Sequence, residues 1–210
     1  MEVNVINISG KETGAKVQLP DAIFAVKPND HAIYLDVKQY LANQRQGTHK
    51  SKQRNEIAGS TRKLYKQKGT GGARAGSIKS PLFNGGGRVF GPRPRNYSFK
   101  LNKKLKAVAR LSALSSMAKD NKIALVENIE MNAAKTKDFI SILSNLKMSD
   151  KKTLMVTGAM NQNVVLSSRN LPKVKVAVAA DLATYDILNA EALLLTEESI
   201  NTLEQLYSNK

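Results

Sequence analysis

The sequence contains no cysteine and no tryptophan, and it has only two histidines, His31 and His49. Without cysteine the chain has no disulfide framework and no thiolate for catalysis or for zinc binding. Neither histidine belongs to a group of cysteines, histidines and acids with the spacing of a metal site. We therefore expect no metal site. We expect His31, at the start of a helix, to take part in helix capping, and His49, among lysines, to contact a phosphate or solvent.

Long apolar runs are also missing. No segment approaches the roughly 18 consecutive apolar residues of a membrane-spanning helix. The first ten residues, MEVNVINISG, have neither the basic nor the apolar region of a secretory signal. We expect no membrane partner and no cleaved leader. With 41% hydrophobic residues among 210, the chain can still bury a sizeable core.

Acidic residues are almost absent from one long stretch. Residues 43–110 hold 18 lysines and arginines but a single acid, Glu56, a formal charge of +17, whereas the remainder holds 15 basic and 16 acidic residues and is nearly neutral. Like charges this dense repel one another unless a polyanion binds them. Such a segment gains free energy from counterion release on nucleic acid, because each neutralised phosphate liberates condensed ions.

Outside the basic stretch, hydrophobic periodicity alternates between strands and helices. It predicts strands at 3–8, 15–19, 122–126, 153–157, 174–180 and 192–196, and helices at 30–46, 102–119, 139–147, 161–168, 185–189 and 196–207. The first two strands would form a hairpin, and Asp30 would cap the first helix. Continuous apolar strands joined by helices favour an α/β fold with a mainly parallel sheet covered on both faces. We predict a single α/β domain over 1–210.

Regular periodicity stops between the helices at 30–46 and 102–119. Residues 47–98 hold 10 of the 13 glycines and three of the six prolines, with few large apolar residues. Structureless loops beyond about 12 to 15 residues are rare in compact domains unless they are functional. We predict that 45–98 is one long irregular basic loop, termed the basic loop below, that is disordered alone and becomes ordered on nucleic acid.

The motifs of nucleotide-binding enzymes fail in this sequence. Glycines 69 and 71 do not begin a G-x-G-x-x-G motif, because Arg74 stands at the third required position. Glycines 86 and 91 have the spacing of a phosphate-binding loop, but Pro92 replaces its lysine. The turn TGAMNQN after the strand at 153–157 has the chemistry of an ordinary tight turn. We expect no catalytic residue and no cofactor.

The basic loop has what RNA recognition needs. Its cations can contact phosphates, and Tyr65, Phe83, Phe90 and Tyr97 can stack on unpaired bases. For Phe83 and Phe90, a small apolar cluster within the loop is an equal alternative. The predicted RNA-binding residues, in the loop and the helix after it, are Arg45, His49, Lys50, Lys52, Arg54, Arg62, Lys63, Lys66, Lys68, Arg74, Lys79, Arg88, Arg93, Arg95, Tyr97, Lys103, Lys106 and Arg110.

Several stretches resemble a known family. RQGTHKSKQR, YKQKGTGGARAGSIKSPLFNGGGRVFGPRPRNYS, KLNKKLKAVARLSAL and LSSRNLPKV are similar to bacterial large-subunit ribosomal protein four, and the similarity covers nearly the whole chain in the same order. The resemblance implies a Rossmann-like α/β body bound to large-subunit rRNA. It also implies a loop that reaches the nascent-peptide exit tunnel and narrows it opposite ribosomal protein twenty-two.

The same resemblance implies a role for the end of the loop. The residues at the tunnel, beside the nascent peptide, would be Tyr65, Gln67, Lys68, Gly69, Thr70, Gly71, Gly72, Ala73 and Arg74. Two departures occur here: the family often has Pro-Trp in place of Leu64-Tyr65, and commonly arginine in place of Gly72. The implied function is a structural constituent of the cytoplasmic ribosome, without catalysis.

Two other classes of function remain as alternatives at this stage. A non-ribosomal RNA-binding protein or RNA chaperone would carry the same basic loop, but it would bind many RNAs with similar affinity. A nucleotide-binding enzyme would use the α/β part and would bind its ligand at the carboxyl ends of the strands.

Overall fold

The computed structural model describes residues 2–208. The chain divides into two units, one formed by Met1–Leu41 together with Lys100–Lys210 and the other by Ala42–Phe99. The first unit contains the β-sheet and its helices, and the second contains the basic loop.

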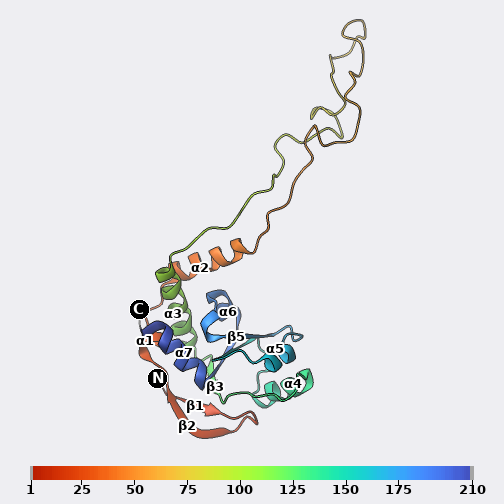
Figure 1. Ribbon diagram of the computed structural model, residues 1–210. Helices are drawn as coiled ribbons and strands as arrows, with labels where there is room; N and C mark the ends of the chain where they lie inside the picture. The colour runs from red at the N-terminus through yellow and green to blue at the C-terminus, as the bar shows by residue number, and fades with distance from the viewer. Residues whose placement is uncertain (1, 209–210) are drawn as a thin grey trace. The chain divides into compact units, whose positions relative to one another are not determined.

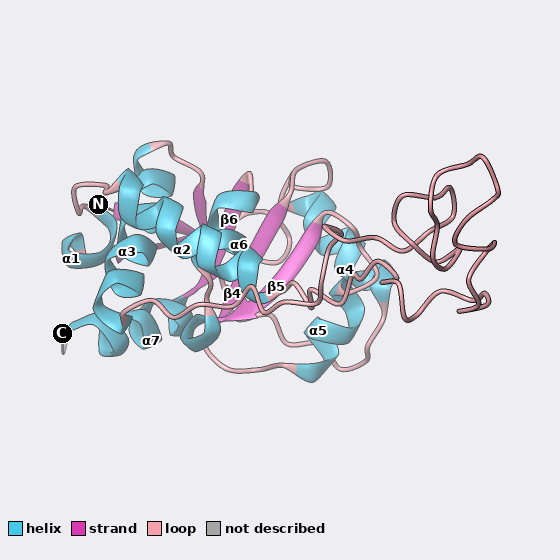
Figure 2. Cartoon of the chain, turned by 90° about the horizontal axis from the view of Figure 1, so that it is seen from above, coloured by secondary structure: helices cyan, strands magenta, loops and turns pink. Residues whose placement is uncertain are grey.

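The α/β unit is built on a six-stranded sheet. Its strands are β1 (Glu2–Ile6), β2 (Glu12–Gln18), β3 (Ile123–Val126), β4 (Thr153–Thr157), β5 (Val174–Val178) and β6 (Ala192–Thr196), in the order β2-β1-β3-β6-β4-β5. β1 and β2 form an antiparallel hairpin, and the other neighbouring pairs are parallel. Figure 2 shows β6, β4 and β5 side by side. The predicted mainly parallel α/β fold is confirmed.

Helices connect these strands. They are α1 (Asp21–Phe24), α2 (Asp30–Asn43), α3 (Lys103–Lys119), α4 (Thr136–Asn145), α5 (Gln162–Ser168), α6 (Thr184–Asn189) and α7 (Glu197–Ser208), with a 3₁₀ turn, η1, at Ala179–Asp181 (Figure 1). The sequence did not predict α1, which has a single turn and begins after Pro20, where a fixed φ suits a helix start. The strand expected to reach residue 180 ends at Val178 because η1 follows it.

Two hydrophobic cores cover the two faces of the sheet. Along β6, Leu193 and Leu195 pack into one core and Leu194 packs into the other, as the two-residue period of a strand requires. The first core includes Leu114 of α3, and the second is centred on Phe139 of α4. All five side chains are almost completely buried, so both faces of this strand are covered, as its continuous apolar run predicts.

The buried face of α2 differs from the apolar stripe of Ile33, Val37, Tyr40 and Leu41 that periodicity predicts. Asp36 and Gln39 are buried, whereas Leu41 is 44% exposed. The Thr184 hydroxyl donates to Asp36 Oδ2 over 2.5 Å, and the Lys106 ammonium donates to Gln39 Oε1 over 3.0 Å. Hydrogen bonds of this kind offset the cost of burying polar groups, and a count of apolar residues cannot detect them.

Both ends of α2 also differ from the sequence prediction. The side chain of Asn29, not that of Asp30, caps the helix, because Asn29 Oδ1 accepts the backbone N–H of Ala32 over 3.1 Å. Asp30 is already the first helical residue, where its charge favours the helix dipole. The helix ends at Asn43, three residues before the predicted end.

The buried face of α3 combines Leu114, a member of the stripe that periodicity predicts (Leu101, Leu105, Val108, Leu111 and Leu114), with small residues. Ala109 and Ala113 are fully buried, but Val108 is 41% exposed. Buried Ser112 and Ser115 accept the backbone N–H groups of residues 29 and 26, both over 3.1 Å. The helix therefore packs partly through small side chains and binds the segment between α1 and α2 through hydroxyl groups.

We expect Asp36→Ala to destabilise the α/β unit by about 1–3 kcal/mol. The substitution leaves the buried Thr184 hydroxyl without its acceptor, and an unsatisfied buried group costs about this much. Chemical denaturation should detect the change, with Lys38→Ala as a control on an exposed position of the same helix. Equal stability of the two variants would show that the Asp36–Thr184 bond is not important for folding.

Candidate nucleic-acid interface

The basic loop has two arms that are joined by backbone hydrogen bonds. Residues 44–102, all of which the structure describes, contain no helix and no strand. The backbone bonds between the arms run from Arg95 N to Gly47 O (3.1 Å), Ser51 N to Pro92 O (3.1 Å), Arg88 N to Lys52 O (3.0 Å) and Leu64 N to Gly76 O (3.0 Å). At the base, Phe99 N donates to the side-chain oxygen Oδ1 of Asn43, the last residue of α2, over 3.2 Å. Figure 1 shows the course of the two arms. Backbone groups thus pair between the arms, and the side chains of the cations remain outside.

Two glycines allow the arms to approach closely. Gly47 has a φ of +66°, and a Cβ there would lie 2.1 Å from the carbonyl oxygen of Arg95. A Cβ on Gly91 would lie 1.7 Å from Ser51 Oγ. At the tip, by contrast, a Cβ on Gly69 or Gly71 would meet nothing within 4 Å. The glycines near the base of the loop are therefore needed for packing, whereas those at the tip leave open space.

Tyr97 organises the base of the loop. The guanidinium carbons of Arg45 and Arg95 lie 3.9 Å and 4.5 Å from the centre of its ring, and its hydroxyl lies 3.2 Å from His49 Nε2. Cation–π contacts hold an arginine over a ring while its N–H groups stay available for a phosphate. The structure thus brings four predicted RNA-binding residues together. Tyr97 contacts arginines here, where the sequence predicted base stacking.

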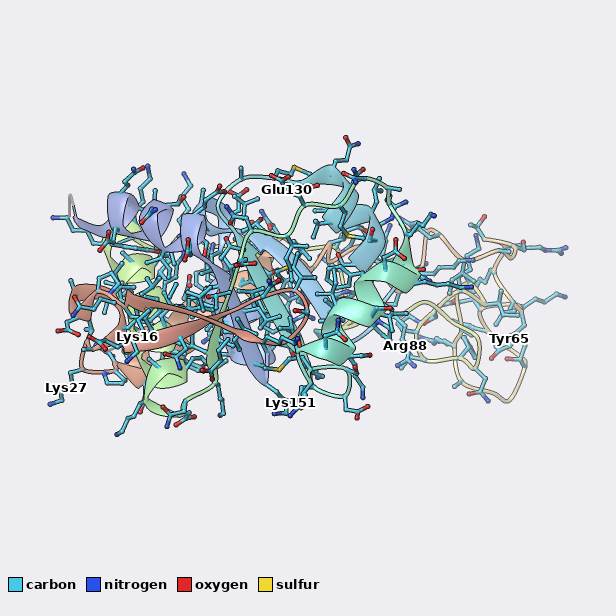
Figure 3. All side chains as sticks on the ribbon, turned by 90° about the horizontal axis from the view of Figure 1, so that it is seen from below. Lys16, Lys27, Tyr65, Arg88, Glu130 and Lys151 are labelled. Atoms are coloured by element: carbon cyan, nitrogen blue, oxygen red, sulfur yellow. The ribbon has the colours of Figure 1, made fainter. Side chains whose placement is uncertain are left out.

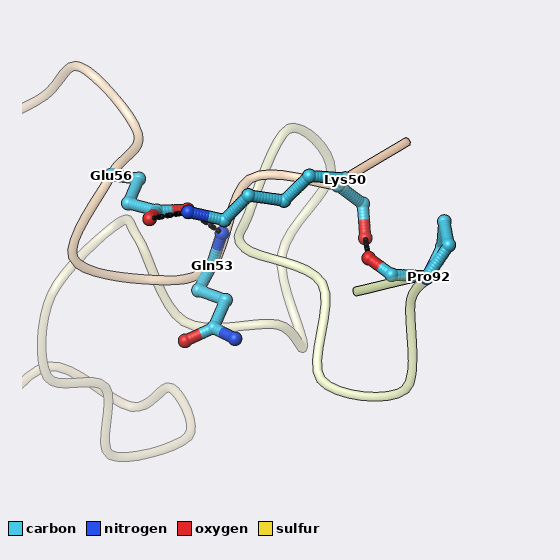
Figure 4. Close-up of polar contacts among 5 residues, drawn as sticks. Lys50, Gln53, Glu56 and Pro92 are labelled. Carbon is cyan, nitrogen blue, oxygen red and sulfur yellow. Dashed lines mark hydrogen bonds and ion pairs between the residues drawn. The ribbon is translucent and has the colours of Figure 1, made fainter. Parts of the chain in front are cut away.

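The one acid of the basic stretch is neutralised inside the loop. The Lys50 ammonium forms an ion pair with the Glu56 carboxylate, which also accepts the backbone N–H of Gln53 over 3.1 Å (Figure 4). The hydrogen bond from Lys50, followed by that from Gln53, holds the pKa of Glu56 below its usual value. Glu56 therefore stays ionised at neutral pH and offsets one cation of the loop.

Most predicted RNA-binding side chains lie on the surface. The exposed ones are Arg45, His49, Lys50, Lys52, Arg54, Arg62, Lys63, Lys66, Lys68, Arg74, Arg88, Arg93, Arg95 and Lys103, and the half-buried ones are Lys79, Tyr97, Lys106 and Arg110. Figure 3 shows Arg88 and Tyr65 on the loop among side chains that project in several directions. A large part of the cationic charge is thus accessible to a ligand.

The first turns of α3 place cations where a helix disfavours them. Lys103, Lys104 and Lys106 lie near its N-terminus, and its first turn contains no acid. The positive end of the helix dipole makes each such cation unfavourable by up to about 1 kcal/mol. Lys106 contacts Gln39, and Arg110 Nη1 donates to the Tyr207 hydroxyl over 3.5 Å. The exposed Lys103 and Lys104 have no comparable contact in the described residues, so their placement favours an anionic partner.

Apolar side chains of the loop are exposed as well. Phe90 is 100% exposed and Leu82 is 92% exposed, while Phe83 is 36% exposed. Phe90 therefore belongs to no apolar cluster within the loop, and base stacking stays a prediction for this residue. It lies two residues after Arg88 and three before Arg93, so an aromatic face and cations are presented together, as base stacking beside phosphate contacts requires.

The carboxyl edge of the sheet has the wrong charge for a nucleotide. A pocket of about 330 Å³ there is lined by Thr157, the last residue of β4, by Gly158 after it, and by Glu130 and Glu198, its charged residues. Two carboxylates repel phosphate. Among residues 2–208, no three His, Asp or Glu side chains are grouped to hold a metal ion. No helix in this range is long and apolar enough to cross a membrane.

Sequence reasoning missed one group of cations in the α/β unit. Lys152, Arg169, Lys173 and Lys175 line one pocket at the amino ends of β4 and β5. They lie on segments that apolar residues separate, and a charge count over all residues outside 43–110 averages them with acids elsewhere in the chain. The signal available in the sequence was the stretch LSSRNLPKV, which contains two of them.

Comparison with known proteins gives a consistent result. The model of the ribosomal protein L4/L1 family matches residues 17–206. The large ribosomal subunit protein uL4 of Phocaeicola vulgatus is 60% identical over 208 residues, which cover 99% of this chain and 100% of that protein. The proteins of the same name from Parabacteroides distasonis and Flavobacterium psychrophilum are 63% and 62% identical over 205 residues, with 98% of each chain covered.

Proposed function

Because the chain belongs to the ribosomal protein L4/L1 family, whose members are structural and non-enzymatic components of the ribosome, we propose that its basic loop binds large-subunit rRNA and reaches the nascent-peptide exit tunnel. The chain is itself a structural constituent of the large ribosomal subunit, which in bacteria is cytoplasmic. Its partners are rRNA and other ribosomal proteins.

The observation that carries the proposal is the charge of the loop combined with its backbone pairing. Four backbone hydrogen bonds join the arms, and contacts of the cations with RNA would order the rest of the loop. Phosphate contacts along both arms would release counterions and hold the loop in folded RNA. Exposed Phe90 supplies a surface for stacking on an unpaired base. Shape and charge together account for the function, and no bond is made or broken.

The tip has the properties that a tunnel wall requires. Gly69 and Gly71 adopt positive φ angles, and no protein atom lies near the position of their missing side chains. A backbone without side chains takes little space in a passage that must admit a moving peptide. Lys68 and Arg74, on either side, can contact rRNA phosphates. In this proposal the tip narrows the tunnel opposite ribosomal protein twenty-two.

A single-cysteine cross-link tests the position of the tip. The natural chain has no cysteine, so Thr70→Cys carries a cross-linker at one defined site, and Lys27→Cys on the α/β unit is the control (Figure 3). On ribosomes stalled with a labelled nascent chain, we expect position 70 to cross-link to the nascent peptide and position 27 not to do so.

Two results would contradict the proposal. Equal cross-linking from positions 70 and 27 would remove the tip from the tunnel. Recovery of the tagged chain with many cellular RNAs, and not with large subunits, would favour the alternative of a general RNA chaperone.

A further inference from the structure

A pocket of about 330 Å³ lies at the carboxyl ends of three neighbouring strands, β3, β6 and β4. Its lining comes from the ends of β4 and β6 and from the segments that follow the three strands. The connections after β4 and β6 leave toward opposite faces of the sheet, because Val164 of α5 packs in one core and Leu203 of α7 packs in the other. Open α/β sheets bind ligands where neighbouring connections diverge in this way. We call this site the carboxyl-edge pocket.

Two buried threonine hydroxyls in the lining have no hydrogen-bond partner. Thr157 and Thr196, the last residues of β4 and β6, are 9% and 3% exposed, and neither Oγ1 has a donor or acceptor in the described part of the chain. They lie two residues after Met155 and Leu194, which pack in the same core, so both threonines belong to the same face of the sheet. A buried hydroxyl without a partner costs free energy, which a bound molecule that donates to these oxygens would recover.

The charged groups of the pocket are both acids. Glu130 and Glu198 are exposed (Figure 3 labels Glu130), and no lysine or arginine is among the lining residues. Asn128 Nδ2 donates to Glu198 Oε1 over 2.6 Å, which orients that carboxylate. Neither carboxylate forms an ion pair with another described residue. In a chain with a net charge of +16, this pocket is therefore a local site for positive charge.

Contacts within the chain hold the walls of the pocket together. A Cβ on Gly158 would lie 2.6 Å from Cβ of Glu198 and 3.0 Å from its carbonyl carbon, so a side chain there would force the two segments apart. Asn161 Oδ1 accepts the backbone N–H of Asn163 over 3.1 Å, and Asn161 Nδ2 donates to the carbonyl oxygen of Ile129 over 3.5 Å. The segment after β4 is thus fixed both to the start of α7 and to the segment after β3.

The lining also has apolar surface between its polar groups, supplied by Ile129 and by Met160, which is 71% exposed. The volume corresponds to about ten water molecules, more than one metal ion fills, and no three His, Asp or Glu side chains are grouped to hold a metal in residues 2–208. Methylene groups that carry ammonium groups match these features. The ammonium groups find carboxylates and hydroxyl oxygens, and the methylene groups find apolar side chains.

We propose that the carboxyl-edge pocket binds a free oligoamine, which is a small aliphatic cation with two or more ammonium groups. The ammonium groups bind Glu130 and Glu198 and donate to the Thr196 hydroxyl, while the methylene groups contact Met160. RNA carries a condensed atmosphere of counterions, so an assembled chain meets multivalent cations at raised concentration. The inference goes beyond the proposed function and does not depend on it, because the pocket uses no residue of the basic loop.

Calorimetric titration of the full-length chain with spermidine, at low salt and without RNA, tests the pocket. We expect one bound spermidine per chain, and the positive charge of the whole chain opposes nonspecific binding of a cation. Glu130→Gln combined with Glu198→Gln should weaken the binding by about tenfold or more, because hydrogen bonds to charged groups are lost. Glu2→Gln combined with Glu204→Gln removes the same charge from exposed positions elsewhere on the α/β unit and should leave the affinity close to that of the natural chain.

A second variant, Thr196→Val, separates binding from folding. Valine has a similar shape and removes the hydroxyl that lacks a partner, so this variant should melt at no lower temperature than the natural chain. Its affinity for spermidine should nevertheless fall by about threefold to tenfold, because one hydrogen bond to the ligand is lost.

Three results would overturn the inference. Absence of spermidine binding, or equal binding by the Glu130/Glu198 variant, would show that the pocket is not an oligoamine site. Displacement of spermidine by an equal concentration of Mg²⁺ would identify a site for a small divalent cation. Equally tight binding of butylamine, which carries the single ammonium group of a lysine side chain, would identify a lysine of a partner protein as the occupant. The cross-linking test of the proposed function is independent of all three.

Discussion

Replacing Arg45, Lys52 and Arg54 together with alanine is expected to reduce the slope of log K against log salt concentration for rRNA binding by about 2 to 3. Each phosphate contact contributes about 0.7 to 0.9 to this slope. All three side chains are exposed, and their guanidinium or ammonium groups form no ion pair in the described loop. Affinity at low salt should therefore fall strongly, while affinities at high salt converge. Titration of a labelled rRNA transcript at several salt concentrations measures both quantities.

The pair Lys50–Glu56 supplies a matched control. Because these residues neutralise each other, Lys50→Ala combined with Glu56→Ala leaves the net charge of the loop unchanged. We expect this double variant to retain most of the slope, whereas Lys50→Ala alone lowers it by leaving Glu56 without its cation. A triple cation variant with the slope of the natural chain would exclude these three residues from the RNA interface.

The α/β fold follows from the sequence because strands and helices have different hydrophobic periods. Runs such as ALLLT at β6 are apolar at every position, which fits a strand buried on both faces. The buried faces of α2 and α3 could not be predicted in the same way. Asp36, Gln39 and Ser112 are buried because partners distant in sequence supply hydrogen bonds, and periodicity carries no information about such partners.

The basic loop could be predicted from its charge and from its lack of periodic apolar residues. Its internal organisation could not, because the arms pair through backbone groups that every residue possesses. The need for glycine at position 47 depends on the carbonyl of Arg95, which lies 48 positions further along the chain. The group of cations at the amino ends of β4 and β5 was missed for a related reason: the two strands become neighbours only in the folded sheet, and that pairing brings Lys152 close to Lys173.

Excision of residues 62–74 is expected to leave the α/β unit folded while it removes the part of the loop that would narrow the tunnel. The flanking chain is already closed on itself, because Ser77 Oγ donates to the carbonyl oxygen of Ser60 over 3.1 Å. Thr61 can therefore be joined to Ala75 through a short glycine–serine linker without moving the arms. The excised segment is exposed throughout, so the free energy of unfolding should change by no more than about 0.5 kcal/mol.

The functional effect of the excision should be large by comparison. Five cations, at positions 62, 63, 66, 68 and 74, disappear together with the glycine tip, so the shortened loop should still bind rRNA through its base but should leave the tunnel wider. Growth with drugs that bind in the exit tunnel should then change, while assembly of the large subunit is retained, as sedimentation would show. Loss of the cooperative melting transition would mean that the tip supports the α/β unit, and unchanged drug sensitivity in assembled subunits would mean that the tip lies outside the tunnel.

The excision removes both charge and shape, and Lys68→Ala combined with Arg74→Ala separates the two. A change in drug sensitivity that requires the full excision is due to the bulk of the tip. A change that the two substitutions reproduce is due to the anchoring of the tip on phosphate.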